Sequence, residues 1–267
     1  MSVYKCEFYA MSFSRKVPFV VVSPNDLPPV IMPQSKRFNR KPKTVLLLNG
    51  YSSSEGDWVF NTPLPALAVK YNVNFVVPAG ENSFYLNQKS STRKYADYVG
   101  FELLQFCNKA FGFDISRENT IVAGLSMGGF GALHTGLAYT DKFSKIIALS
   151  SALIIHNIKN IKPGFQDMIS SYEYYDDVFG PLDELEASEK NPETLIRNCL
   201  EKNIQMPEIY MAIGTEDFLY KENQLFRQFL TDNKVPFTYK EEPGIHDYSF
   251  WNKHLDLGLE WALGNEE

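Results

Sequence analysis

Apolar residues gather in short continuous runs along the chain, and polar, Gly or Pro residues bound each run. An apolar run of about four to eight residues is typical of a strand buried on both faces of a parallel sheet. The runs that fit this pattern, the last of them weakly, are Thr44–Asn49, Val73–Pro78, Asn119–Gly124, Ser144–Ser150, Glu208–Gly214 and Pro236–Glu242. Before them, YKCEFYA and VPFVVVS flank a short polar turn, which predicts a hairpin.

Segments with apolar residues at helical spacing lie between these runs. They are Leu64–Lys70, Lys94–Phe111, Gly128–Tyr139, Lys221–Asn233 and Phe250–Leu263. Strand and helix therefore alternate through most of the chain, and this alternation predicts an α/β fold with a mostly parallel sheet and helices on both faces. The antiparallel hairpin opens the sheet and brings it to eight strands. We find no repeat or polar linker, and we expect one domain over residues 1–267.

The stretch 151–203 breaks the alternation, because it holds no buried-strand run and is rich in Tyr, Asp and Asn. We interpret it as an excursion of helices and loops over the carboxyl edge of the sheet. Open α/β folds keep their binding crevice at that edge. The excursion is therefore expected to cover part of the site.

Composition and charge exclude several classes of protein. With 267 residues, 44% of them hydrophobic, the chain can bury a large core. A net charge of −6 gives no electrostatic footprint for nucleic acid or an anionic membrane. The one basic cluster, Ser35–Lys43, is interpreted as a solvated loop. The three cysteines are widely spaced without a C-x-x-C pair, so they predict neither a disulfide framework nor a zinc site, and Cys107 is expected in the core.

The N-terminal residues alternate polar and apolar side chains and lack the uninterrupted apolar region of a signal peptide. No stretch approaches the roughly 18 consecutive apolar residues that a membrane-spanning helix needs. We therefore expect a soluble cytoplasmic protein without a membrane partner. The composition is compatible with a homo-oligomer and does not require one.

Chemistry enters with Gly124-Leu125-Ser126-Met127-Gly128, which matches G-x-S-x-G. The pattern alone is weak, since a chance match occurs in about one chain in ten of this length. Its context is more specific, because it follows the predicted strand TIVA and precedes the predicted helix GFGALHTGL. Glycines two positions away make room for a serine on a tight, strained bend at a helix N-terminus. The structural alternative is a glycine-rich phosphate loop or a plain turn.

A serine hydroxyl needs a base to take its proton, and the chain offers four histidines. His134 lies about 12 Å along the helix that follows Ser126 and cannot turn back to it. His156 falls in the excursion and His254 inside the last predicted helix, so both are expected to be surface or packing residues. His246 lies in a Pro- and Gly-marked loop after the last strand run, and it is the expected base.

The imidazole needs a carboxylate that holds its tautomer and stabilises the cation. Folds of this architecture place the acid between the serine and the histidine. The run EIYMAIG ends at Gly214 and leaves Glu216 and Asp217 in the loop behind it. Either residue could serve on chemistry alone. Asp247 is expected to lie too close in sequence to reach the far side of His246.

Tetrahedral intermediates also need N–H donors aimed at the developing oxyanion. One predicted donor is the backbone N–H of Met127. The other is expected in the loop Asn49-Gly50-Tyr51, which follows a buried strand, with the N–H of Tyr51 or Ser52 as the candidate. Simple turn chemistry is the alternative interpretation of Gly50.

The segments AGLSMGGFGAL, GTEDFLY and GIHDYSFWNKHL, in this order, resemble the esterase D-like α/β hydrolases, and among them the bacterial tributyrin esterase and feruloyl esterase branch. The resemblance covers nearly the whole chain. It implies an α/β-hydrolase fold, Asp217 as the acid, His246 as the base, and the N–H groups of Met127 and Tyr51 as oxyanion donors. The family commonly has His-Gly where this chain has Asn49-Gly50, which leaves the conformation of that loop open.

Together these observations predict a serine carboxylic-ester hydrolase that works through an acyl-enzyme on Ser126 and needs no metal or organic cofactor. The resemblance implies short-chain acyl esters as substrates, including tributyrin and acetylated or feruloylated sugars. The first alternative is thioester hydrolysis, as in S-formylglutathione hydrolases, or acyl transfer by the same triad. A peptidase and a binding module without catalytic activity are further alternatives.

Overall fold

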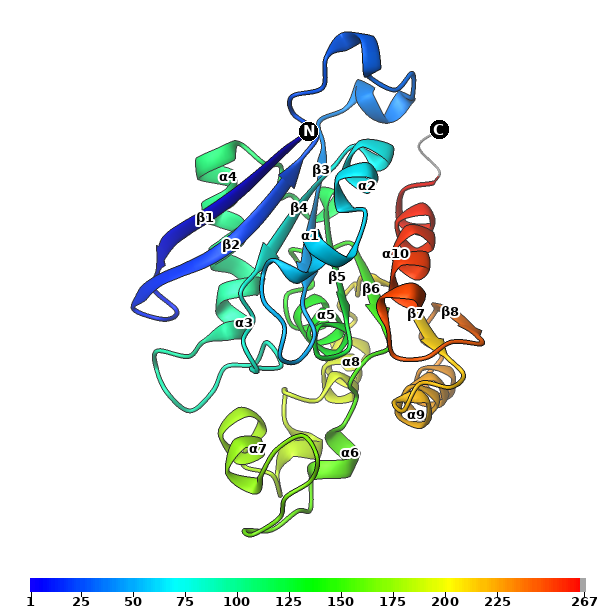
Figure 1. The fold of residues 1–267 in the computed structure, drawn as a ribbon. Helices are drawn as coiled ribbons and strands as arrows, with labels where there is room; N and C mark the ends of the chain where they lie inside the picture. Colours follow the sequence, from blue (N-terminus) through cyan, green and yellow to red (C-terminus); the bar gives the residue numbers. More distant parts are fainter. Residues whose placement is uncertain (265–267) are drawn as a thin grey trace.

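The computed structural model describes residues 1–264, and the last three residues of the predicted domain range lie outside the described part. Its centre is one sheet of eight strands in the order β1-β2-β4-β3-β5-β6-β7-β8 (Figure 1). The strands are β1 (Ser2–Ala10), β2 (Arg15–Ser23), β3 (Lys43–Leu48), β4 (Val73–Pro78), β5 (Thr120–Leu125), β6 (Lys145–Leu149), β7 (Glu208–Gly214) and β8 (Phe237–Glu242). Every predicted strand is present, and each of its ends matches the prediction or is shifted by at most two residues.

The hairpin and the parallel part of the sheet meet at β4. Strand β1 pairs with β2 in antiparallel register, and β2 pairs with β4 in the same manner. All pairs from β4 through β3, β5, β6 and β7 to β8 are parallel. The carboxyl ends of these strands therefore meet along one edge, as the alternating pattern predicted.

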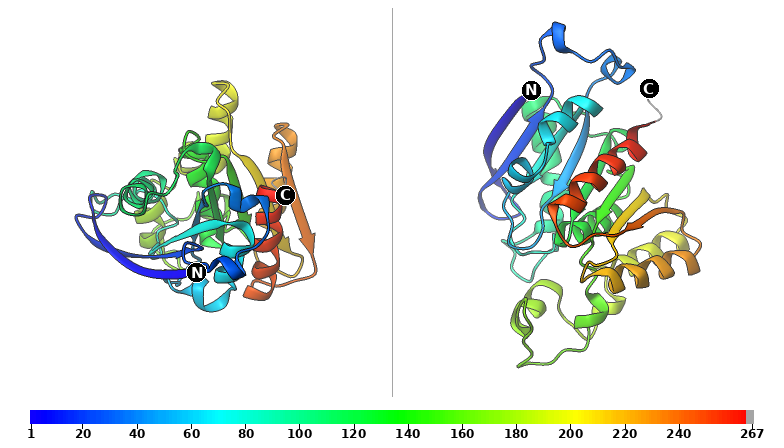
Figure 2. Two further views of the ribbon diagram at one scale, coloured as in Figure 1. Left: turned by 90° about the horizontal axis from the view of Figure 1, so that it is seen from above. Right: turned by 45° about the vertical axis from the view of Figure 1, so that its right-hand side comes forward.

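Helices cover both faces of the sheet (Figures 1 and 2). Side chains of β3 alternate between them: Leu46 and Leu48 belong to one core cluster, and Val45 and Leu47 to the other. The first cluster includes side chains from α4 (Leu103–Phe111), α5 (Met127–Ala138) and α9 (Tyr220–Asp232). The second includes side chains from α1 (Asp57–Asn61), α2 (Leu64–Tyr71) and α10 (Tyr248–Leu263).

The predicted helices are present, and one of them is interrupted. The range 94–111 forms α3 (Tyr95–Asp97), a π-helical turn (Tyr98–Glu102) and then α4. Cys107 on α4 is fully buried, as predicted. Helix α1 was not predicted, because five residues show too little of a helical period to be recognised. No helix within residues 1–264 is long and apolar enough to cross a membrane.

The excursion 151–203 connects β6 to β7 along the chain. It contains α6 (Ile155–Ile158), α7 (Tyr172–Phe179) and α8 (Pro192–Glu201). Its helices α6 and α7 lie beyond the carboxyl ends of the strands (Figure 1; Figure 2, right). Helix α8 packs on α5, so the excursion is joined to the helix that follows Ser126. The prediction of helices and loops at this edge of the sheet is confirmed.

The interpretation of Ser35–Lys43 as a solvated loop is wrong for Arg37. Its side chain is only 5% exposed, and its guanidinium lies 5.1 Å from the ring centroid of Tyr71. Glu260 of α10 approaches the same guanidinium at 3.7 Å. An arginine can stack its planar cation on an aromatic ring, and this contact between distant segments removes it from solvent.

Candidate active site

Ser126 occupies the bend between β5 and α5. Its backbone has φ 55° and ψ −119°, in a region that non-glycine residues rarely adopt. The surrounding chain holds this conformation: the Ser126 N–H donates to the Leu149 carbonyl at 2.8 Å, and the Ser126 carbonyl accepts from the Ala152 N–H at 2.9 Å. Both partners belong to β6 or the residues that follow it. Neighbouring β6 thus keeps the serine on the bend.

The glycines on either side of Ser126 are required by close backbone contacts. A Cβ on Gly124 would lie 2.2 Å from the carbonyl oxygen of Gly128. A Cβ on Gly128 would lie 2.3 Å from the carbonyl oxygen of Leu48 and 2.7 Å from that of Asn49. These distances are far shorter than any van der Waals contact. The predicted crowding of strand and helix around the serine is therefore present.

We expect Gly128→Ala to destabilise the fold by about 3 kcal/mol, at the upper end of the cost of overpacking, because backbone rather than flexible side chain obstructs the new methyl group. Urea unfolding measures the effect. Gly56→Ala is the matched control: its Cβ would lie 3.1 Å from the exposed ring of Phe60 and 3.6 Å from Ser54 Oγ, with no backbone in the way, and the change should cost about 0.5 kcal/mol or less. Equal unfolding midpoints for Gly128→Ala and wild type would contradict the expectation.

His246 follows β8 and lies directly against the serine. Its Nε2 is 3.0 Å from Ser126 Oγ, and 17% of its side chain is exposed. The Trp251 ring meets the imidazole edge-on at a centroid distance of 4.8 Å, and the Phe218 ring lies 4.5 Å away. The Trp251 indole donates to Ser150 Oγ at 3.0 Å, which ties this ring to the residue after β6. The imidazole thus contacts two aromatic rings and remains partly exposed to solvent.

Asp217 completes a chain of three side chains. Its Oδ2 lies 2.8 Å from His246 Nδ1, and its Oδ1 accepts from the Leu219 N–H at 2.9 Å. The carboxylate is fully buried. Because a carboxylate only accepts, Nδ1 carries the proton and Nε2 presents a lone pair to the Ser126 hydroxyl. This arrangement can draw the serine proton onto the imidazole and stabilise the resulting cation.

The two acidic candidates point in different directions. The exposed carboxylate of Glu216 accepts from the Gly244 N–H, and this bond holds the pKa of Glu216 below its usual value. Its own backbone N–H donates to the Gly244 carbonyl at 3.0 Å. Glu216 therefore binds the loop between β8 and α10 that carries Gly244 and His246, which we call the histidine loop. Of the two carboxylates, it is Asp217 that reaches the imidazole. Asp247 caps α10 by accepting from the Phe250 N–H at 3.0 Å, away from His246 Nδ1.

The other histidines lie in different surroundings, as expected. His134 is buried on α5, where burial lowers its pKa to about 4. His156 Nε2 lies 2.8 Å from a carboxylate oxygen of Glu193 within the excursion. His254 Nε2 lies 2.9 Å from Glu242 Oε1. None of these contacts involves Ser126.

The predicted oxyanion donors lie on two segments beside Ser126. Met127 is the first residue of α5, where helix geometry leaves N–H groups without intrahelical acceptors. Gly50 approaches the serine closely, since a Cβ there would lie 3.6 Å from Ser126 Cβ. The Ser52 N–H already donates to Asn82 Oδ1 at 2.8 Å. Across residues 1–264 the Tyr51 N–H has no protein acceptor, so of the two candidates in this loop it is the one left available.

Asn49, where the resembling family commonly has His, is buried and anchored by its neighbours. Its side-chain amide donates to the Pro78 carbonyl at 2.8 Å. The Tyr85 hydroxyl accepts from the Asn49 N–H at 2.7 Å and lies 3.1 Å from its carbonyl oxygen. Sequence reasoning did not identify Tyr85 or Asn82, because their partners are 36 and 30 residues away and no local pattern marks them.

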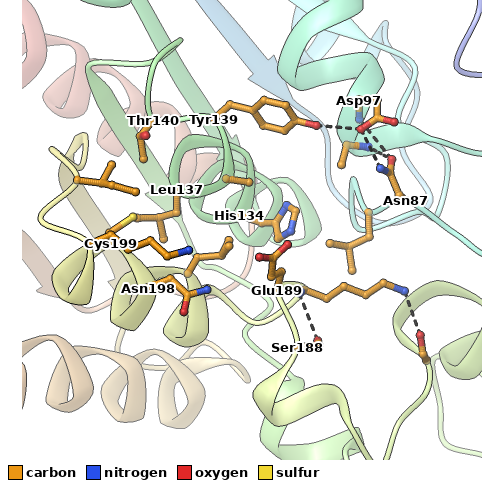
Figure 3. A pocket seen from close by; sticks show the side chains of 18 of the residues that line it. Asn87, Asp97, His134, Leu137, Tyr139, Thr140, Ser188, Glu189, Asn198 and Cys199 are labelled. Atoms are coloured by element: carbon orange, nitrogen blue, oxygen red, sulfur yellow. Dashed lines mark hydrogen bonds between the residues drawn. The ribbon is translucent and has the colours of Figure 1, made fainter.

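A pocket of about 740 Å³ lies elsewhere, between the second half of α5, α8 and the loop after α7 (Figure 3). His134, Glu189 and Cys199 line it, whereas Ser126, Asp217 and His246 do not. Its volume lies within the range of small-molecule binding sites. We place the candidate active site at Ser126 instead, because among residues 1–264 it is there that a serine hydroxyl, an imidazole and a carboxylate form a hydrogen-bonded series. Within residues 1–264, no three His, Cys, Asp or Glu side chains are grouped to hold a metal ion.

Comparison with known proteins gives consistent matches over nearly the whole chain. A family model described as "Putative esterase" matches residues 25–262. The acetyl esterase of Caldicellulosiruptor saccharolyticus is 37% identical over 266 residues, 98% of each protein. The structure of FphF, a fluorophosphonate-binding serine hydrolase of Staphylococcus aureus, matches with 25% identity, a TM-score of 0.84 and 98% of each chain covered. S-formylglutathione hydrolase FrmB of the same organism matches with 26% identity, a TM-score of 0.81 and the same coverage.

Proposed function

The chain belongs to the putative esterase family and is a carboxylesterase with the α/β-hydrolase fold, and from this premise we propose that Ser126, His246 and Asp217 are its catalytic triad. The observation that carries the proposal is the continuous chain of contacts from Ser126 Oγ to His246 Nε2, at 3.0 Å, and from His246 Nδ1 to Asp217 Oδ2, at 2.8 Å. Ester hydrolysis is the reaction that this geometry serves.

In the proposed mechanism, Ser126 Oγ attacks the ester carbonyl while its proton passes to His246 Nε2. The imidazolium gives this proton to the departing alkoxide, which leaves an acyl group bound to Ser126. Water then attacks the acyl-enzyme, His246 takes a proton from that water, and the carboxylic acid leaves with Oγ protonated again. Asp217 keeps the imidazole oriented and stabilises its positive charge throughout.

The N–H groups of Met127 and Tyr51 are the proposed oxyanion donors. They belong to segments that meet at the serine, one at the start of α5 and one after β3. Negative charge develops on the carbonyl oxygen only as the tetrahedral intermediate forms. Donors held in place beforehand therefore stabilise the transition state more than the bound ester.

We propose short-chain acyl esters as substrates, with acetyl as the main acyl group. The acetyl esterase relative supports this choice. Next to the proposed oxyanion donor, the Tyr51 ring packs against an aromatic cluster. The ring centroid of Phe84 lies 6.5 Å from that of Tyr51, and the ring centroid of Phe179 lies 4.7 Å from that of Phe84. Phe84 and Phe179 are buried, so little room is left there for a long acyl chain.

The alcohol part of the ester has apolar side chains near His246. Phe218 packs against the imidazole, and Ile245 precedes His246 in the sequence. Both side chains are exposed and can contact an apolar alcohol group.

The second candidate is hydrolysis of S-formylglutathione or a similar thioester by the same triad, which the 26% identity to FrmB favours. Thioester and oxygen-ester hydrolysis share the nucleophile, the base and the oxyanion donors. They differ in the leaving group, because a thiolate departs without the proton that an alkoxide needs.

We expect kcat/KM for p-nitrophenyl esters to be highest with acetate or butyrate and to fall at least about tenfold by octanoate, since a buried aromatic wall tolerates few added methylenes. Steady-state rates with acetate to octanoate, tributyrin, methyl ferulate and S-formylglutathione provide the measurement. A maximum at octanoate would contradict the short-chain proposal. A much larger kcat/KM for S-formylglutathione than for any oxygen ester would favour the second candidate.

A further inference from the structure

The Tyr51–Ser52 turn has a strained residue that one distant side chain holds in place. Ser52 has φ 61°, in the left-handed region that costs a serine free energy. Its N–H donates to Asn82 Oδ1 at 2.8 Å. Asn82 lies in the loop after β4, and its side chain is the acceptor that this conformation needs.

The position of the Tyr51 N–H depends on this contact because of how peptide planes join. The Ser52 N–H and the Tyr51 carbonyl share one rigid plane, and the Tyr51 N–H lies in the plane before it. At the other side of the turn, the Asn49 N–H donates to Tyr85 at 2.7 Å. The Tyr51 N–H therefore lies between two anchored points, and both anchors come from the loop after β4.

Helix α7 of the excursion reaches the same loop. The Tyr174 hydroxyl donates to the Asn82 carbonyl at 2.7 Å. The Tyr174 ring also packs edge-on against the Tyr51 ring, with a centroid distance of 6.0 Å. Tyr174 thus contacts both Tyr51 and Asn82, the residue whose side chain holds the Tyr51–Ser52 turn.

We propose that Asn82 is a positioning residue that aims the Tyr51 N–H at the oxyanion, and that Tyr174 holds Asn82 in place. This inference rests on the proposed function, since it assumes that Tyr51 is an oxyanion donor. The proposal gives the excursion 151–203 a second role besides covering part of the site. Through Tyr174 and Asn82, α7 orients the Tyr51–Ser52 turn and so influences the rate of the chemical step.

If the Tyr51 N–H is displaced by a fraction of an ångström, the transition state is destabilised more than the bound ester. We expect Asn82→Ala to lower kcat for p-nitrophenyl acetate about 10- to 100-fold, with KM changed less than about threefold. A trifluoromethyl ketone, which forms a tetrahedral adduct with the serine, should bind more weakly by the same factor as the loss in kcat/KM.

Tyr174→Phe keeps the ring and removes the hydroxyl, so the expected loss in kcat is about three- to tenfold. Tyr175→Phe is the matched control on the same helix. It removes a hydroxyl that bonds only within the excursion, to Asp167 at 2.9 Å, and kcat should stay at the wild-type value. In the Asn82→Ala background, Tyr174→Phe should add little, because its path to the turn is already broken.

Folded Asn82→Ala protein with wild-type kcat and wild-type ketone affinity would overturn the proposal, and so would an effect on KM alone. If Asn82→Ala does not fold, Tyr174→Phe decides, and an effect equal to that of Tyr175→Phe overturns it. Failure of the proposed function gives a different result: the wild type would show no turnover that depends on Ser126.

Discussion

Ser126→Ala lowers kcat for p-nitrophenyl acetate by about 10⁶-fold if Ser126 is the nucleophile, because loss of a triad nucleophile has an effect of that order in other serine hydrolases. Alanine retains the backbone of the bend, whose hydrogen bonds to Leu149 and Ala152 are made by main-chain atoms. The fold should therefore persist. Steady-state rates, corrected for spontaneous hydrolysis, measure the loss.

Labelling with a fluorophosphonate probe is an independent measurement of the same claim. The probe reacts with an activated serine, so the wild type should be labelled and Ser126→Ala should not. Ser90→Ala is the matched control, since this exposed hydroxyl contacts only Thr92 and lies outside the site. Substantial turnover or labelling in folded Ser126→Ala protein would show that another residue is the nucleophile.

Asp217→Asn is expected to lower kcat by about 10⁴-fold. An asparagine amide can donate to His246 Nδ1 and so favour the tautomer that has its proton on Nε2. That proton would face the Ser126 hydroxyl, and the imidazole could no longer accept from it. The measurement is kcat with p-nitrophenyl acetate, with unfolding by urea to confirm that the variant retains its fold.

Glu216→Gln is the matched comparison for the neighbouring carboxylate. The glutamine oxygen can still accept from the Gly244 N–H, so the histidine loop should keep its anchor and kcat should stay within about threefold of wild type. Wild-type rates in both variants would remove Asp217 from the mechanism. A large loss in Glu216→Gln with little change in Asp217→Asn would make Glu216 the acid instead.

Much of the fold follows from local patterns in the sequence. The apolar run Asn119–Gly124 predicts β5 to within one residue at each end, and the glycine- and alanine-rich segment behind it predicts α5. Both predictions depend on neighbours along the chain, because side-chain periodicity and glycine positions are properties of a short segment. The placement of Ser126 between them follows from the same local signal, as does the loop that carries His246.

Other features depend on which side chains meet across the structure. Glu216 and Asp217 are adjacent and chemically equivalent as candidates, yet one reaches Gly244 and the other reaches His246. The Tyr51 and Ser52 N–H groups are likewise equivalent in the sequence, until Asn82 occupies one of them. Arg37 was expected in solvent and is buried by the distant ring of Tyr71.

By itself, the sequence determined the order of strands and helices, the strained bend at Ser126 and the histidine loop, because each of these is encoded over a few consecutive residues. Only the tertiary structure decided which carboxylate faces the imidazole and which N–H remains for an oxyanion, and only it connects α7 to that loop. These outcomes depend on directions and contacts between residues about 30 to 120 positions apart, and the energies that select them exist only once the sheet has brought those segments together.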